Sequence, residues 1–169
     1  VAPQIVGLFV NAPVDDVNET AEALELDIVQ LSGGEPIAYV DEIERLVIKV
    51  IHVPSELESR VAVASVGRGL EKVLAAGAIP MLDAKVAGKF GGTGRTVNVD
   101  VARQLAPSHD FLLAGGLTSE TVAERVMEVR PWGVDVSSGV ETDGVKDPAK
   151  IVSFARGVGL AGGGTDEPA

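Results

Sequence analysis

The 169-residue chain contains no cysteine. This excludes a disulfide framework, a thiolate metal site and thiol catalysis by the chain's own residues. Basic residues are also scarce, with 14 Lys and Arg against 25 Asp and Glu and a formal net charge of −11. Such a balance argues against binding to a nucleic-acid backbone, which needs concentrated positive charge, although a small anion can still be held locally.

Long apolar runs are absent as well. No stretch approaches about 18 uninterrupted apolar residues, and the N-terminal residues lack the basic-then-apolar pattern of a secretory signal. We therefore expect a cytoplasmic protein without membrane partners. The only histidines, His52 and His109, have no further ligand-type residues at metal spacing, so we expect no metal site.

What the chain does contain is a regular alternation of strand and helix patterns, which continues to about residue 158. Six strands are predicted, over residues 4–10, 27–31, 46–51, 79–85, 111–116 and 133–139. Helices are predicted after Pro13, near Pro36, over 54–77, over 97–105, and at the N-caps Thr118 and Asp147. This alternation is typical of βαβ units and a parallel sheet.

The length and the 46% hydrophobic content are sufficient for the core of one domain. We predict a single domain over residues 1–160 and a flexible tail over 161–169. An open doubly wound sheet is one alternative. It is weakened because no G-x-G-x-x-G follows the first strand and no acid is placed to bind a ribose.

Two runs near the C-terminus, LLAGGLTSE (112–120) and VDVSSG (134–139), are each a short apolar strand that ends in small residues. The N–H groups of such turns, together with the dipole of the following helix, favour phosphate binding. Any tight strand-to-helix connection favours Gly and Ser, so either run alone is weak evidence. On successive parallel strands they indicate the phosphate clamp after strands 7 and 8 of a (β/α)8 barrel, of which this chain would contain strands 3 to 8.

Three further features can carry chemistry or need explanation. Asp83 ends a predicted strand, where barrel enzymes keep their catalytic groups, although an N-cap or a salt bridge is the alternative. The GGTG run (91–94) predicts either a substrate lid or an ordinary surface loop, and the lid is favoured by three flanking cations, Lys85, Lys89 and Arg95. Lys49 is an unexpected charge in the β-branched run LVIKVI.

Over about residues 4–158 the chain contains, in this order, the motifs GLFVN, DIVQLSG, IKVIHV, LDAKVAGKFGGTGRT, LLAGGLTSETV, RPWGVDVSSGVE and GVKDPAKI. Together they closely resemble the phosphoribosylanthranilate isomerase family of tryptophan biosynthesis. The resemblance implies a (β/α)8 barrel and the substrate N-(5-phosphoribosyl)anthranilate. It also implies an Amadori rearrangement to 1-(2-carboxyphenylamino)-1-deoxyribulose 5-phosphate, without metal or organic cofactor.

The resemblance assigns roles to individual residues. Asp83 matches the general acid, which must hold its proton near neutral pH through partial burial or a nearby negative charge. Asp135 is expected to orient the substrate. The phosphate and substrate contacts are expected at Gly115, Gly116, Ser137, Ser138 and Gly139, with Gly92, Thr93 and Gly94 of the lid.

The chain also departs from the family pattern. The family's first strand carries a K-[IV]-C-G motif whose Cys is the general base, its second strand carries an Arg, and neither strand is present here. Ser32 replaces the His of the family's QLHG motif, and His52 stands where an Arg is usual. We therefore expect an N-terminally truncated isomerase that needs a complementing N-terminal segment or self-association.

Two alternatives to this reading remain. The first is a catalytically inactive barrel fragment that binds phosphate or a partner chain. The second is another phosphate-binding barrel enzyme, such as an epimerase or indole-glycerol-phosphate synthase.

Overall fold

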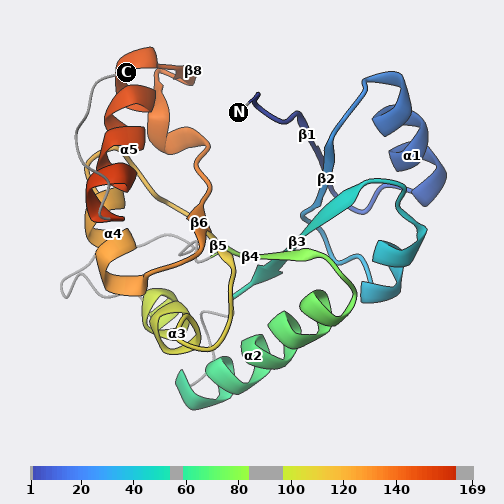
Figure 1. Cartoon of the computed structure of the whole chain (residues 1–169), viewed down its shortest axis with the longest axis horizontal. Helices are drawn as coiled ribbons and strands as arrows, with labels where there is room; N and C mark the ends of the chain where they lie inside the picture. Colours follow the sequence, from blue (N-terminus) through green and yellow to red (C-terminus); the bar gives the residue numbers. More distant parts are fainter. Residues whose placement is uncertain (1, 54–58, 84–96, 163–169) are drawn as a thin grey trace. The chain divides into compact units, whose positions relative to one another are not determined.

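The structure is a computed structural model that describes residues 2–53, 59–83 and 97–162 (Figure 1). In these ranges the predicted alternation is confirmed: six strands form one sheet in the order β1-β2-β3-β4-β5-β6, with helices between them. The elements are β1 (Val6–Phe9), α1 (Val14–Ala23), β2 (Ile28–Leu31), the 3-10 helix η1 (Ile37–Glu42), β3 (Leu46–His52), α2 (Ser59–Ala75), β4 (Ile79–Asp83), α3 (Val97–Leu105), β5 (Leu112–Ala114), α4 (Val122–Val129), β6 (Gly133–Val134), the 3-10 helix η2 (Ser138–Val140), β7 (Glu141–Thr142), β8 (Val145–Lys146) and α5 (Pro148–Ala161).

The chain divides into two compact units, Val1–Ile51 with Ala64–Met81, and His52–Val63 with Leu82–Ala169. In the first unit, β1 pairs with β2 and β2 with β3, both in parallel. α1 buries Val17 and Ala21 against Val29 and Leu31 of β2. Leu24, which follows the last residue of α1, is 62% exposed.

In the second unit, β5 and β6 pair in parallel. α4 and α5 lie side by side (Figure 1). Asp147 is confirmed as the cap of α5, since its Oδ1 accepts hydrogen bonds from Ala149 N at 2.9 Å and Lys150 N at 3.3 Å. Thr118 is not the N-cap of α4: its carbonyl accepts from two following amides, and this turn delays the start of the helix to Val122.

Two other predicted elements differ in detail. The helix expected near Pro36 is the 3-10 helix η1. The strand expected over 133–139 is reduced to two residues, because the chain leaves the sheet after Asp135 N donates to Leu113 O at 2.9 Å. Residues 135–139, which we call the β6 turn, then lead into η2 and the hairpin β7–β8, which had not been predicted.

Candidate active site

The predicted phosphate-binding turns meet in the second unit. The turn after β5, residues 115–118, begins with Gly115 at φ 94° and Gly116 at φ 72°, a backbone conformation that favours glycine. A Cβ added at Gly139 of the β6 turn would clash with the carbonyl oxygen of Leu117. The two turns are therefore in backbone contact, as expected for strand ends that share one edge of a parallel sheet.

Lys146 adds a cation at the β6 turn. Its Nζ donates to Ser137 O at 2.9 Å and forms an ion pair with Glu141 Oε1 at 2.6 Å. The hairpin β7–β8 brings this side chain back to the turn nine residues upstream. No role had been assigned to this lysine from the sequence, although it lies in the quoted GVKDPAKI motif.

Asp83 is the last residue of β4, and His52 is the last residue of β3. His52 Nδ1 lies 3.5 Å from Asp83 Oδ2, with side chains that are 59% and 26% exposed. Backbone contacts support the arrangement, since Val53 N donates to Asp83 O at 3.3 Å. A basic ring therefore lies against the carboxyl group that the resemblance assigns to acid catalysis.

Asp135 interacts electrostatically with Asp83. Burial raises the pKa of Asp135 most strongly, the negative charge of Asp83 raises it further, and Lys146 opposes both effects. A carboxyl group that keeps its proton to a higher pH than usual, beside a second carboxyl, is typical of sites that perform acid–base chemistry.

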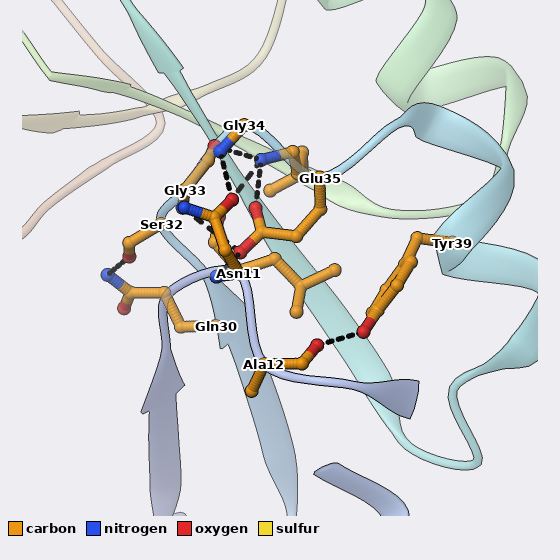
Figure 2. Close-up of polar contacts among 10 residues, drawn as sticks. Asn11, Ala12, Gln30, Ser32, Gly33, Gly34, Glu35 and Tyr39 are labelled. Atoms are coloured by element: carbon orange, nitrogen blue, oxygen red, sulfur yellow. Dashed lines mark hydrogen bonds and ion pairs between the residues drawn. The ribbon is translucent and has the colours of Figure 1, made fainter. Parts of the chain in front are cut away.

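A second polar cluster lies in the first unit, where β1 and β2 end beside the middle of β3 (Figure 2). Lys49 Nζ forms a buried ion pair with Glu35 Oε2 at 2.8 Å. Burial opposes the charge of Glu35, but hydrogen bonds from Lys49 and from Asn11 N outweigh it, so that the pKa of Glu35 is lowered. The sequence signal for this pair was the unexplained charge of Lys49, while Glu35 had not been singled out.

The remaining predicted site residues are Gly92, Thr93 and Gly94 of the lid. They lie outside the described residues, as do the three cations that flank them, Lys85, Lys89 and Arg95. In the described ranges, no group of three or more His, Asp and Glu side chains is arranged to hold a metal ion. No helix of the same ranges is long and apolar enough to cross a membrane.

The sheet consists of parallel strands connected by helices, with carboxyl groups at the ends of β4 and β6 and two glycine turns in contact. These features define an α/β-barrel type of enzyme that acts on a phosphorylated small molecule. Comparison with known proteins identifies the family. The family model described as N-(5'phosphoribosyl)anthranilate (PRA) isomerase matches residues 1–156. The chain belongs to this family, and it is an isomerase of tryptophan biosynthesis.

Individual relatives agree. The N-(5'-phosphoribosyl)anthranilate isomerase of Dehalococcoides mccartyi is 38% identical over 161 residues, which cover 95% of this chain and 73% of the relative. That of Geotalea uraniireducens is 44% identical over 153 residues, covering 90% and 70%. This family match favours the isomerase over the two alternatives raised from the sequence, an inactive binding module and another barrel enzyme.

Solved structures give the same result for the fold. The phosphoribosyl anthranilate isomerase of Thermotoga maritima superimposes with a TM-score of 0.73 at 30% identity, covering 92% of this chain and 72% of the other. A structure of the enzyme in complex with reduced 1-(o-carboxyphenylamino)-1-deoxyribulose 5-phosphate gives a TM-score of 0.67 at 28% identity, covering 92% and 71%. The expected TIM-barrel class of fold is thereby confirmed.

Proposed function

We propose that Asp83 is the general acid in the isomerisation of N-(5'-phosphoribosyl)anthranilate. The observation that carries this proposal is the electrostatic interaction between the carboxyl groups of Asp83 and Asp135. Burial and the negative charge of Asp83 raise the pKa of Asp135, which makes this edge of the sheet suitable for acid–base chemistry. As the general acid, the carboxyl group of Asp83 donates a proton to the ribose ring oxygen, the ring C–O bond breaks, and the C1–N bond becomes a protonated Schiff base.

The turns after β5 and β6 are the proposed phosphate grip. Gly115 and Gly116 allow a close approach of the backbone, and Ser137, Ser138 and Gly139 supply hydroxyl and amide donors. The lid residues Gly92, Thr93 and Gly94 are proposed to close over the same ligand on the strength of the sequence alone.

Asp135 has a positioning role in this proposal. With its raised pKa, its carboxyl group can donate a hydrogen bond to a sugar oxygen in the fraction of molecules in which it is protonated.

The general base that removes the C2 proton is proposed to come from an added strand, because the resemblance assigns this role to a cysteine and the chain contains none. β1 is the end strand of the sheet and, in the described part of the chain, is paired with β2 alone. Leu8 in β1 is 60% exposed and Val10, just beyond its end, is 57% exposed, and a further strand would cover both apolar side chains. A segment outside these 169 residues can supply this strand, whereas a second copy of the chain would bring no cysteine.

Complementation tests this proposal directly. The chain is mixed with a peptide that carries the cysteine-bearing strand of a relative, and turnover is followed by the fluorescence of the anthranilate group. We expect turnover with this peptide and none with a Cys→Ala version of it. Equal turnover with both peptides would contradict the proposed source of the base, while sedimentation at increasing chain concentration separates complementation from self-association.

A further inference from the structure

Lys49 is almost completely buried in β3, with its side chain 8% exposed, and its partner Glu35 is 2% exposed. The ammonium group donates to Glu35 Oε2 at 2.8 Å, to Gly33 O at 2.9 Å and to Leu31 O at 3.4 Å. Two of these acceptors are carbonyl oxygens at the end of β2 and just beyond it. The lysine thus connects the interior of β3 to the backbone that follows β2.

Glu35 and Asn11 hold the amides of the same segment, residues 32–34, which we call the β2 turn (Figure 2). Glu35 Oε1 accepts from Asn11 N at 2.7 Å and from Gly33 N at 3.2 Å. Asn11 Oδ1 accepts from Gly34 N at 2.8 Å. A Cβ added at Gly33 would lie 2.5 Å from Asn11 Oδ1 and 2.8 Å from Glu35 Oε1, so the turn is closely enclosed by these side chains.

Stability alone explains such an arrangement poorly. The desolvation of two buried charges offsets most of their attraction, and apolar replacements of buried pairs are often as stable or more stable. What this pair provides is a single conformation, since Glu35 Oε1 accepts from Asn11 N and Gly33 N while Lys49 Nζ donates to Gly33 O. Parallel α/β sheets bind their ligands at these carboxyl ends of strands.

The β2 turn also has polar side chains that can reach a ligand. Gln30 Nε2 donates to Ser32 Oγ at 3.1 Å, and both side chains are only partly buried. They alternate with Leu31, which points into the apolar core, so they lie on the opposite face of the sheet. The conformation fixed by the ion pair therefore determines where Ser32 is placed.

We propose that Glu35 and Lys49 are positioning residues, which hold the β2 turn and its Ser32 in the conformation that contacts the isomerase substrate. The inference rests on the proposed function, and it concerns a part of the chain to which that proposal assigns no residue. The residues act through backbone groups and take no part in bond making or breaking.

Two double variants that both remove the charges test this role. Glu35→Gln with Lys49→Met keeps an oxygen acceptor for Asn11 N and Gly33 N, whereas Glu35→Met with Lys49→Met removes it. Arg125→Met with Glu128→Gln is the matched control, because it removes a 2.7 Å ion pair on the surface of α4. Thermal unfolding first establishes which variants fold, and calorimetric titration then measures their affinity for reduced 1-(o-carboxyphenylamino)-1-deoxyribulose 5-phosphate.

We expect the Met/Met variant to bind this analogue at least about tenfold more weakly, since a turn that adopts the binding conformation a tenth of the time lowers the affinity by that factor. The Gln/Met variant should stay within about threefold of the parent, and the control should be unchanged. Amide exchange at Gly33 and Gly34 should be faster in the Met/Met variant. Parent-like affinity in a folded Met/Met variant would overturn the inference.

Asn11→Gly gives an independent answer if the Met/Met variant does not fold. It leaves the ion pair intact, suits the φ of 51° at this position, and removes the acceptor for Gly34 N. We expect roughly threefold weaker binding, and unchanged affinity would count against the positioning role. Failure of the parent chain itself to bind the analogue would instead refute the proposed substrate site, so the two failures are distinguishable.

Discussion

Replacing Glu35 with Gln tests the energetics of the buried ion pair. The substitution leaves the Lys49 ammonium 8% exposed, with two carbonyl oxygens and a neutral amide as its partners. Removing one partner of a buried pair typically costs about 3–5 kcal/mol. Because two of the three acceptors of Lys49 remain, we expect the lower end, about 3 kcal/mol, at pH 7.

The loss should depend on pH with a defined sign. The pKa of Glu35 is lowered in the folded protein, so its carboxylate contributes fully to stability above the ordinary value, near 4.5. As the pH falls through the lowered value, the folded protein takes up this proton and the contribution disappears. The free-energy difference between the parent and Glu35→Gln should therefore shrink as the pH falls from the ordinary pKa of a glutamate through the lowered pKa of Glu35.

Urea unfolding at several pH values, followed by circular dichroism, measures both quantities. For a chain of this size, about 3 kcal/mol corresponds to a fall in Tm of roughly 6–12 °C. Arg125→Met is the control, since its partly exposed pair with Glu128 should contribute less than about 1 kcal/mol. A loss below about 1 kcal/mol for Glu35→Gln, or one that does not diminish at all in acid, would refute the reasoning.

Three further predictions concern the second unit. Gly139→Ala should force the two proposed phosphate-binding turns apart and weaken the binding of inorganic phosphate at least about tenfold in a calorimetric titration. Retained affinity would show that Gly139 is not part of the phosphate site. Asp147→Ala should lower the free energy of unfolding at pH 7 through loss of the α5 cap, as measured by urea unfolding. Hydrogen bonds from Thr142 and two amides lower the pKa of Asp147. The difference in stability between the parent and Asp147→Ala should therefore vanish as the pH falls through that lowered pKa. A difference that persisted in acid would exclude the carboxylate as its source. His52→Gln should reduce kcat roughly tenfold through its contact with the proposed acid, whereas His109→Gln should not, and equal effects of the two would argue against a specific role.

The sequence was sufficient to predict the parallel sheet and the helices that connect its strands, because apolar periodicity and strand-end turns are local signals. It was also sufficient to predict that Gly116 and Gly139 follow successive parallel strands, and the structure pairs these strands, β5 and β6, in parallel. The helix starting at Val122 and the short β6 were misjudged. In both places a few backbone hydrogen bonds, which the carbonyl oxygens of Thr118 and Leu113 accept, determine where the element begins or ends.

The pairing of side chains was less predictable. Lys49 was recognised as anomalous, but its partner Glu35 lies 14 residues earlier in a segment without regular structure, and no periodicity links them. The contact between His52 and Asp83 follows from the sheet order, because both residues end adjacent strands. The pKa shift of Asp135 depends on burial, which a single sequence does not specify.

Turnover by an Asp83→Asn variant tests the central claim most directly. The parent, Asp83→Asn and the control Asp110→Asn, an exposed residue outside the site, are compared under the complemented conditions that support turnover, using the fluorescence of the anthranilate group. We predict a loss of about 10²–10⁴-fold in kcat for Asp83→Asn alone, with its Tm and its affinity for the reduced product analogue retained. Near-parent turnover by Asp83→Asn would contradict the assignment of Asp83 as the general acid.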